Sequence, residues 1–557
     1  MFKKTPLILA LGLALATQAG AQVAVTPGEG TQIVTGSVES DADITTLFGN
    51  ADTSNVHLTF NDNAFSQSFR ATLPGEGTLT LVSKADGNFI TGPVKINNKT
   101  NLTIIKESAT GAIFAIDHIG SAPRDKIIIN TGDVDQDNLP ERPNSMRLTN
   151  TGGSVFDVTA PTDWDEDVPL RYSLDSDHYY IESTAEDAPT IKAKDLLNIG
   201  QNSTKPLKAG LKFEQVSDSL TTPTDLTLKG VKTAIDLDNT ALRTALRTVD
   251  ITGTVLLKND AHAIFGALED EETSTVPSEM FNSEAYVDAQ KLQSLGNVFI
   301  GNGADGWHEQ SLTIKGTQKS PTAIDATDSH ILGNAATITI AAGSADGKAI
   351  DLKGTSTAAF FSKDSMTVKG NIAIAEGATL AIRSQGTYAF DGELNNQGKL
   401  FIDADTLTGS GNNAKLVSQG TTAIKVAKAA TFGGGLETQS GELALAADSV
   451  QVAGPMTVGA DTTLDVSAKT MNVAKTIENQ GGTLSLTTDK LVASESANFS
   501  QGTTTLSTKE LTVAGDITLG GADTQLEITQ GSLQAKNVSV SEGAQLGITT
   551  KSEAKRS

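Results

Sequence analysis

Residues 442–452 read ELALAADSVQV, and close variants follow as TLDVSAKTMNV at 463–473 and TLSLTTDKLVA at 483–493. In each stretch apolar residues alternate with polar or small ones, which is the pattern of a β-strand with one buried face. An apolar pair recurs about every 20 to 22 residues, which predicts a repeating architecture. The recurring pairs are Leu443/Leu445, Leu464/Val466, Leu484/Leu486, Thr504/Leu506, Leu526/Ile528 and Leu546/Ile548.

Two further series of apolar residues have the same period. The second series begins five residues after each pair, and the third is looser. Three short strands in every period predict an all-β parallel β-helix, or β-solenoid, because each strand then pairs with its equivalent one coil earlier and no backbone group is left unpaired. The second series is Val450, Met471, Leu491, Leu511 and Leu533, and the third is Met456, Ile477, Ile517 and Val538.

The repeat continues toward the N-terminus with less regular spacing. We expect a signal peptide at 1–21, an irregular β-solenoid with acidic insertions at 22–337, and a regular parallel β-helix at 338–557 with an uncapped C-terminal end. The longer insertions are expected within 121–225 and 240–300, the latter with a helical-looking stretch.

The composition excludes several classes of protein. The chain has 557 residues and no Cys, so it contains no disulfide, thiolate metal site or cysteine nucleophile. Only 4% of the residues are aromatic, which favours stacked aliphatic layers over a globular core. The formal net charge of -24 disfavours nucleic acid as a partner, because phosphate backbones would be repelled.

The first 21 residues, MFKKTPLILALGLALATQAGA, have the three parts of a Sec-type signal peptide. Lys3 and Lys4 form the positive start, residues 7–16 form the apolar stretch, and residues 19–21 form a small-residue cleavage site. No later segment approaches the ~18 consecutive apolar residues of a transmembrane helix. The sequence therefore predicts export.

The chain resembles the passenger region of a bacterial autotransporter, also called a type V secreted protein. The resemblance rests on the signal peptide, the ladder from 443 to 548, phrases such as KAIDLKG at 348–354 and the lack of Cys. It implies a right-handed parallel β-helix displayed at the cell surface, where many passengers act as adhesins. The Gly-Asp-Ser-Gly signature of serine-protease passengers does not occur in the sequence.

A complete autotransporter also carries a C-terminal translocating β-barrel with aromatic girdles. Residues 443–557 contain one Phe, Phe499, and no Trp or Tyr, and the sequence stops at Ser557. We therefore expect a fragment of a longer reading frame, with the translocator barrel as a partner missing from this chain.

The resemblance implies a non-enzymatic adhesive or interaction role. The expected partners are host or neighbouring-cell surface molecules, either protein or glycan. The expected location is the cell surface, outer-membrane-associated or extracellular. The alternative is a carbohydrate-active β-helix enzyme, a polysaccharide lyase or glycosidase, which would need two or three carboxylates, often with Lys or Arg, converging in a groove. Asp117, Asp236, Asp325 and Asp351 each follow an Ala-Ile pair and could form such a row, but their repetition favours a turn at a strand end.

Asp133, Asp135 and Asp137 stand at alternate positions, the spacing with which calcium loops surround a hard cation with oxygen ligands. They form a weak candidate for a calcium site, because Asn138 stands where the turn glycine of an EF-hand belongs. A solvated acidic turn is the simpler interpretation, and no other cofactor is expected.

Two other sets of residues are not interpreted as ligand-binding sites. Residues 301–306, GNGADG, match the glycine spacing of a dinucleotide fingerprint, but a strand and no helix is expected after them, so they are interpreted as a turn. The six histidines show no metal-ligand spacing and are interpreted as surface or turn residues. They are His57, His118, His178, His262, His308 and His330.

Overall fold

The computed structural model describes a fold that consists of strands, turns and connecting residues, with no helix among the described residues. This agrees with the all-β class that the alternating pattern predicts. The described residues are 24–28, 31–35, 55–60, 69–72, 77–90, 94–97, 100–116, 128–130, 145–159, 171–176, 178–196, 210–214, 225–265, 311–520, 524–541 and 543–549.

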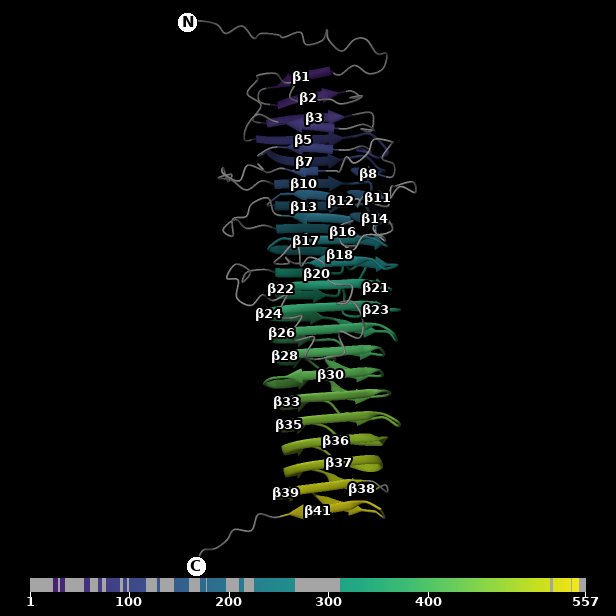
Figure 1. Cartoon of the computed structure of the whole chain (residues 1–557), viewed down its shortest axis with the longest axis vertical. Coiled ribbons are helices and arrows are strands. Elements are labelled where there is room, and N and C mark those ends of the chain that lie inside the picture. The colour runs from purple at the N-terminus through teal and green to yellow at the C-terminus, as the bar shows by residue number, and fades with distance from the viewer. Residues whose placement is uncertain are drawn as a thin grey trace, which may run out of the picture.

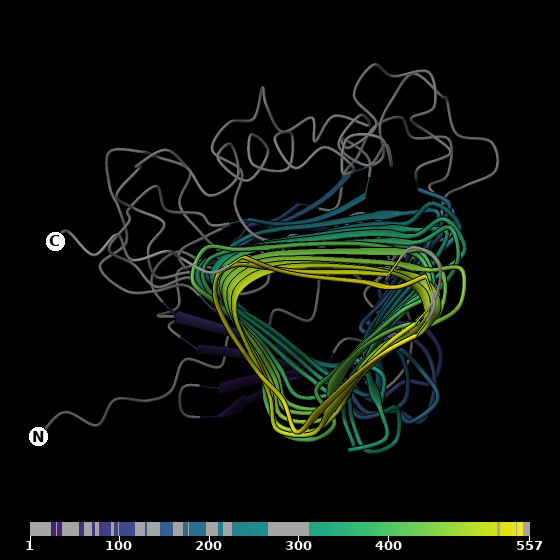
Figure 2. The ribbon, with the colours of Figure 1, turned by 90° about the horizontal axis from the view of Figure 1, so that it is seen from below.

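The described strands stack in parallel coils along one long axis (Figure 1). Seen along that axis, the coils outline a triangle with three flat faces (Figure 2). We call these faces first, second and third in the order in which the chain passes them. The parallel β-helix predicted from the repeat is therefore confirmed. A separate antiparallel pair, β1 (Ala24–Gly28) and β2 (Thr31–Thr35), precedes the stack.

The first face is one continuous parallel ladder. From β22 onward its strands, apart from the short β31, are the C-terminal parts of longer strands that have already crossed the third face. In pairing order its members are β3 (Asn55–Phe60), β5 (Gly77–Ser83), β7 (Thr100–Lys106), β10 (Ser145–Asn150), β13 (His178–Ser183), β16 (Asp225–Asp238), β18 (Thr248–Lys258), β20 (Ser311–Lys315), β22 (His330–Ala341), β24 (Thr357–Lys369), β26 (Thr379–Phe390), β28 (Lys399–Gly409), β31 (Ala429–Phe432), β33 (Glu442–Val452), β35 (Thr463–Val473), β36 (Ile477–Ala493), β37 (Ala497–Val513) and β39 (Gln525–Gln534).

The second face is built mostly from short strands, with parts of β16, β18, β36 and β37 completing it. Its other members are β8 (Phe114–Ile116), β11 (Phe156–Thr159), β14 (Ile191–Lys194), β21 (Ile324–Thr327), β23 (Lys348–Lys353), β25 (Asn371–Ile374), β27 (Leu394–Asn396), β29 (Lys415–Ser418), β32 (Gly435–Thr438), β34 (Met456–Val458), β38 (Asp516–Leu519) and β40 (Asn537–Val540).

The third face combines short strands with the N-terminal or middle parts of the long strands from β22 to β39. Its other members are β4 (Phe69–Thr72), β6 (Val94–Asn97), β9 (Ile128–Asn130), β12 (Arg171–Asp175), β15 (Gly210–Glu214), β17 (Ala241–Ala245), β19 (His262–Phe265), β30 (Thr421–Val426) and β41 (Gln545–Thr549).

The register confirms most of the predicted ladder and corrects one step. Leu445, Val466, Leu486 and Leu506 are partners on successive coils. Leu506 then pairs with Leu526, whereas the sequence pattern predicted Ile528. A register irregularity follows, in which two extra residues are absorbed before the second series resumes with Leu511 opposite Leu533. Because the shift is two residues, the same side chains still point inward.

The stretch 240–300 is more regular than the sequence suggested. Residues 241–265 contain β17, β18 and β19, which pair in register with the coils on both sides. The interpretation of this stretch as insertion is therefore wrong up to Phe265. The helical-looking stretch at 283–295 lies outside the described residues.

The core is a column of stacked aliphatic and aromatic side chains, with buried polar groups at the corners. Asn479 is 2% exposed and turns the chain from the second face to the third. Its side-chain amide donates to Gly482 O at 3.0 Å and to Thr503 O at 3.2 Å, and its Oδ1 accepts from Gly482 N at 2.9 Å. The Asn479 side chain therefore provides hydrogen-bond partners for backbone groups at the corner, where the strand ladder is interrupted.

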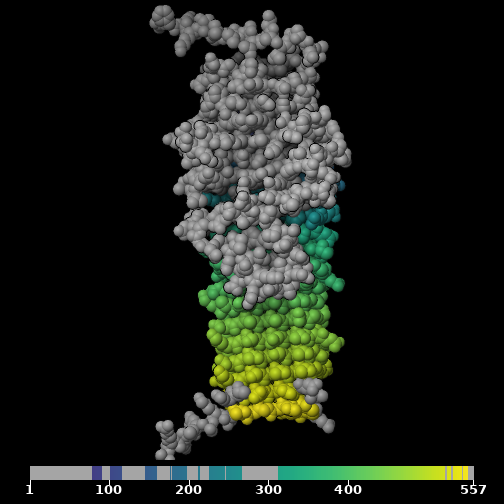
Figure 3. All heavy atoms as spheres, viewed as in Figure 1, coloured from purple at the N-terminus to yellow at the C-terminus, as the bar shows by residue number. Residues whose placement is uncertain are grey.

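The regular coils form even layers on the surface (Figure 3). Side chains at inward positions are buried through β38, where Ile517 and Leu519 are both 0% exposed. On the last described coil, Val538 is 38%, Val540 47% and Ile548 47% exposed, because no further described strand covers them.

Candidate functional site

Charged side chains repeat at the corner between the third and first faces. Four residues occupy equivalent positions on successive coils, since the residues directly before and after each one are register partners. We call them the corner charge row: Asp448, Lys469, Asp489 and Lys509. Lys469 Nζ lies 2.8 Å from Asp448 Oδ1, and Lys509 Nζ lies 2.7 Å from Asp489 Oδ1. All four side chains are at least 53% exposed. The row therefore presents alternating charges to solvent along the axis.

The Ala-Ile-Asp phrases form a second set of charges, on the second face. Asp236 lies in β16, Asp325 in β21 and Asp351 in β23, each inside a strand. The interpretation as a turn at a strand end is therefore wrong for these three residues, because the isoleucine of each phrase points into the core and the aspartate points out. Asp117 lies outside the described residues.

Lysines neutralise these carboxylates. Asp325 and Asp351 are register partners, and Lys353 Nζ contacts both, at 2.6 Å from Asp325 Oδ1 and 3.2 Å from Asp351 Oδ2. Burial by itself would lower the pKa of Lys353, but the hydrogen bond to Asp325 and the charges of both carboxylates raise it overall. On an earlier coil, Lys258 Nζ lies 2.9 Å from Asp236 Oδ1.

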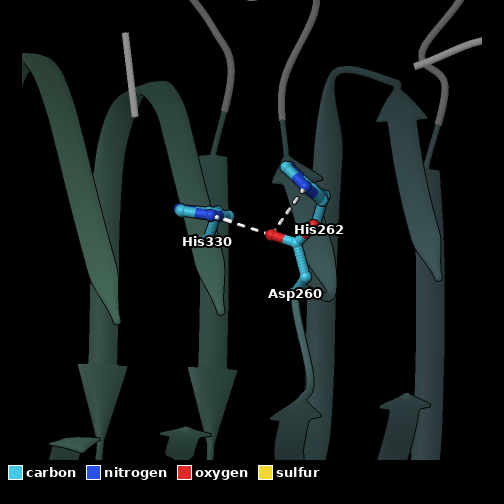
Figure 4. A group of neighbouring side chains, drawn as sticks. All are labelled: Asp260, His262 and His330. Carbon is cyan, nitrogen blue, oxygen red and sulfur yellow. Dashed lines mark hydrogen bonds and ion pairs between the residues drawn. The ribbon is translucent and has the colours of Figure 1, made fainter. Parts of the chain in front are cut away.

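A third group, which we call the histidine cluster, consists of Asp260, His262 and His330 (Figure 4). His262 begins β19 and His330 begins β22, and the two residues are register partners on the third face. Asp260 occupies the turn before β19. The ligand-type atoms of the three side chains all lie within 4.8 Å of one another.

The electrostatics of the histidine cluster lower the pKa values of Asp260 and His262. Hydrogen bonding to His262, with a further contribution from His330, holds the pKa of Asp260 well below its ordinary value. Burial lowers the pKa of His262, and the hydrogen bond to Asp260 offsets only part of this effect. Near neutral pH, the cluster therefore contains a carboxylate beside an uncharged imidazole.

Local ligand spacing does not reveal this cluster, because Asp260 and His330 lie 70 positions apart in sequence. The available signal was a repeated tripeptide, Asp260-Ala261-His262 and Asp328-Ser329-His330, at the same position of two coils. Residues 266–310, between these two coils, separate the two copies in sequence and hide the repeat. His262 and His330 are strand residues and register partners, so neither is the turn residue that the sequence also allowed.

The other candidate residues and segments lie largely outside the described part of the chain. Asp133, Asp135 and Asp137 lie outside the described residues, and so do the glycine motif at 301–306 and the signal peptide at 1–21. His118 and His308 also lie outside them. His178 lies at the start of β13, in an ion pair with Asp225.

Comparison with protein-family models, curated proteins and solved structures found no match to this chain. The described residues include no helix with the length and hydropathy required to cross a bilayer.

Proposed function

We propose that this chain is an exported β-solenoid, displayed at the cell surface or released from it, that binds molecules on host or neighbouring cells without catalysing a reaction. The observation that carries the proposal is the corner charge row, a shallow and exposed charge pattern repeated on successive coils. A repeated surface on a stiff stack makes many weak contacts at once, so its affinity comes from multivalency and needs no single deep pocket.

The proposed class is an autotransporter-type passenger with an adhesive role. Support comes from the parallel β-helix, the chain's lack of Cys and the N-terminal sequence that resembles a Sec signal. Protein or glycan surfaces are the proposed partners, and an outer-membrane translocator is the proposed route to the surface.

The alternative of a carbohydrate-active enzyme draws its support from Asp325 and Asp351, two carboxylates on adjacent coils. The pairing of lysine with aspartate seen at Lys353 recurs at Lys258 and Asp236 on an earlier coil, and this repetition favours a structural role, because a catalytic set of residues is needed only once. The non-catalytic proposal is therefore preferred.

An adhesion assay tests the binding role. Beads coated with the purified chain at increasing density are allowed to settle on an epithelial monolayer and on a bacterial lawn, and the attached beads are counted after washing. We expect attachment that rises more steeply than coating density, as multivalent binding does. A variant with Lys469→Gln and Lys509→Gln should attach less on the surface that the chain binds, whereas Lys475→Gln, which alters an exposed ion pair with Glu495, should behave as wild type.

The outcomes separate the two functions. Absence of attachment on both surfaces at every density would contradict the adhesive proposal. Release of reducing ends or unsaturated sugars from a panel of acidic and neutral polysaccharides would favour the enzyme instead.

Export is tested separately by expressing the full chain in a Gram-negative host. The N-terminus of the product is then determined in the cytoplasmic, periplasmic and external fractions. The proposal expects a mature product that begins at Gln22 outside the cytoplasm. An uncleaved chain confined to the cytoplasm would contradict it.

A further inference from the structure

The parallel register of the third face brings two imidazoles together. His262 on β19 and His330 on β22 are partners, and their ring centroids lie 4.7 Å apart, which is the spacing of adjacent strands. The next partners in this ladder are small, Ala241 on one side and Thr357 on the other. The two rings are tilted by 36° relative to each other, and neither has a bulky register partner on its outer side.

A carboxylate faces both rings. Asp260 Oδ1 lies 3.6 Å from His262 Nε2 and 3.2 Å from His330 Nε2 (Figure 4). The backbone of Asp260 is in the left-handed region with φ of 62°, and its N–H donates to Asp328 O on the next described coil at 2.6 Å. This hydrogen bond fixes the turn, so the carboxylate is positioned by the stack itself.

We propose that Asp260, His262 and His330 bind a divalent cation of the zinc type. Two imidazole nitrogens and one carboxylate oxygen form a donor set that zinc and other late first-row metals prefer. A tetrahedral zinc site with bonds of about 2.0 to 2.1 Å separates neighbouring ligand atoms by about 3.3 to 3.4 Å. The two observed separations from Asp260 Oδ1, 3.6 and 3.2 Å, lie on either side of that value.

The local environment suits metal exchange with solvent. The side chains of His262 and His330 are 17% and 19% exposed, whereas that of Asp260 is 69% exposed. The cation would therefore be held against the stack by the imidazoles, with its open side toward solvent. Water or a donor atom of a bound molecule completes the coordination. This site does not depend on the proposed adhesive role.

The test uses the full chain, freed of metal with a chelator and then dialysed. Zn²⁺ affinity is measured by competition with a chromophoric chelator, in excess Mg²⁺ so that oxygen-only surface sites are occupied. Co²⁺ is used in parallel, because tetrahedral Co²⁺ has a strong visible absorption. We expect one tight equivalent and a tetrahedral Co²⁺ spectrum.

The variants His262→Ala and His330→Ala should each bind Zn²⁺ at least tenfold more weakly, since loss of a ligand costs at least as much as loss of an outer-shell partner. Asp260→Asn keeps the side-chain shape and should also weaken binding tenfold. His178→Ala is the matched control, because it removes a histidine that faces a different aspartate. Wild-type affinity in the Asp260, His262 and His330 variants, or absence of the tetrahedral spectrum from the wild-type chain, would overturn the proposal.

Discussion

Lys353 Nζ lies 2.6 Å from Asp325 Oδ1, so an ion pair joins two adjacent coils of the second face. The same ammonium also contacts the carboxylate of Asp351, at 3.2 Å. Asp351 is only 12% exposed at its side chain, because Lys348 and Lys353 cover it. The ammonium group of Lys353 therefore neutralises two carboxylates, Asp325 and Asp351, which the repeat places opposite each other on adjacent coils.

Replacing Lys353 with Met should lower the free energy of unfolding by about 0.5 to 1 kcal/mol, since the pair is partly exposed and solvent screens it. Adding Asp325→Asn to Lys353→Met should restore part of the loss, because one of the two facing charges is then removed. Urea denaturation followed by circular dichroism measures the effect. Lys369→Met, at an exposed position on the first face, is the control, and an equal loss in that variant would refute the assignment.

The ion pair between Lys353 and Asp325 also makes the free energy of unfolding depend on pH. The pKa of Lys353 is raised in the folded chain, so its contribution to stability is complete below the ordinary lysine pKa of about 10.4. The contribution is lost as the pH rises through the raised value. The stability difference between wild type and Lys353→Met should therefore stay constant near neutral pH and shrink in strongly alkaline solution. A difference that grows with pH in that range would show that the sign is wrong.

The buried amide of Asn479 should be a strong determinant of stability. Replacement by Ala leaves backbone groups of the corner without their partners, at a cost of about 1 to 3 kcal/mol. The exposed Asn472 on the preceding coil provides the control, and Asn472→Ala should change the unfolding midpoint little. Equal midpoints for the two variants would contradict this role.

The close stacking of coils leaves no room for a side chain at Gly454. A Cβ at this position would lie 1.3 Å from Gly434 O, so Gly454→Ala must displace a coil. We expect a loss of about 1 to 3 kcal/mol in urea denaturation, as for other overpacked sites. Gly547→Ala is the control, because its Cβ would meet only Leu526 O, at 3.9 Å. Wild-type stability of Gly454→Ala would mean that the coils are less tightly stacked.

The sequence predicted the C-terminal coils well because each inward position repeats at a nearly constant interval. Leu445, Val466 and Leu486 were aligned by spacing alone, and the structure pairs them. The step from Leu506 to Leu526 was missed because the two extra residues enter β39 after Ile528 and not before Leu526. Period-two alternation cannot detect a shift of two residues, since the same face stays buried.

The histidine cluster could not be found from spacing because its members lie far apart in sequence. His330 and Asp260 are separated by 70 positions, and only the register shows that they lie on adjacent coils of the third face. The strand position of Asp325 was missed for a related reason. A repeated aspartate fits a turn or an outward strand position equally well until the partner strand is known.

Each coil advances the chain by one strand spacing along the axis. One ladder on the third face contains Ala423, Ala444 and Gln525. Ala423 and Gln525 are five coil steps apart, and Ala444 is one step from Ala423. The absence of Cys allows clean nitroxide labelling of two introduced cysteines. Pulsed electron paramagnetic resonance on Ala423→Cys/Gln525→Cys should give a distance centred near ~24 Å.

The Ala444→Cys/Gln525→Cys pair should be shorter by one step of about 4.8 Å. Narrow distributions that differ by one step are the predicted result. Broad distributions, or two distances that do not differ by one strand spacing, would contradict the stacked architecture on which the proposed binding surface and metal site both depend.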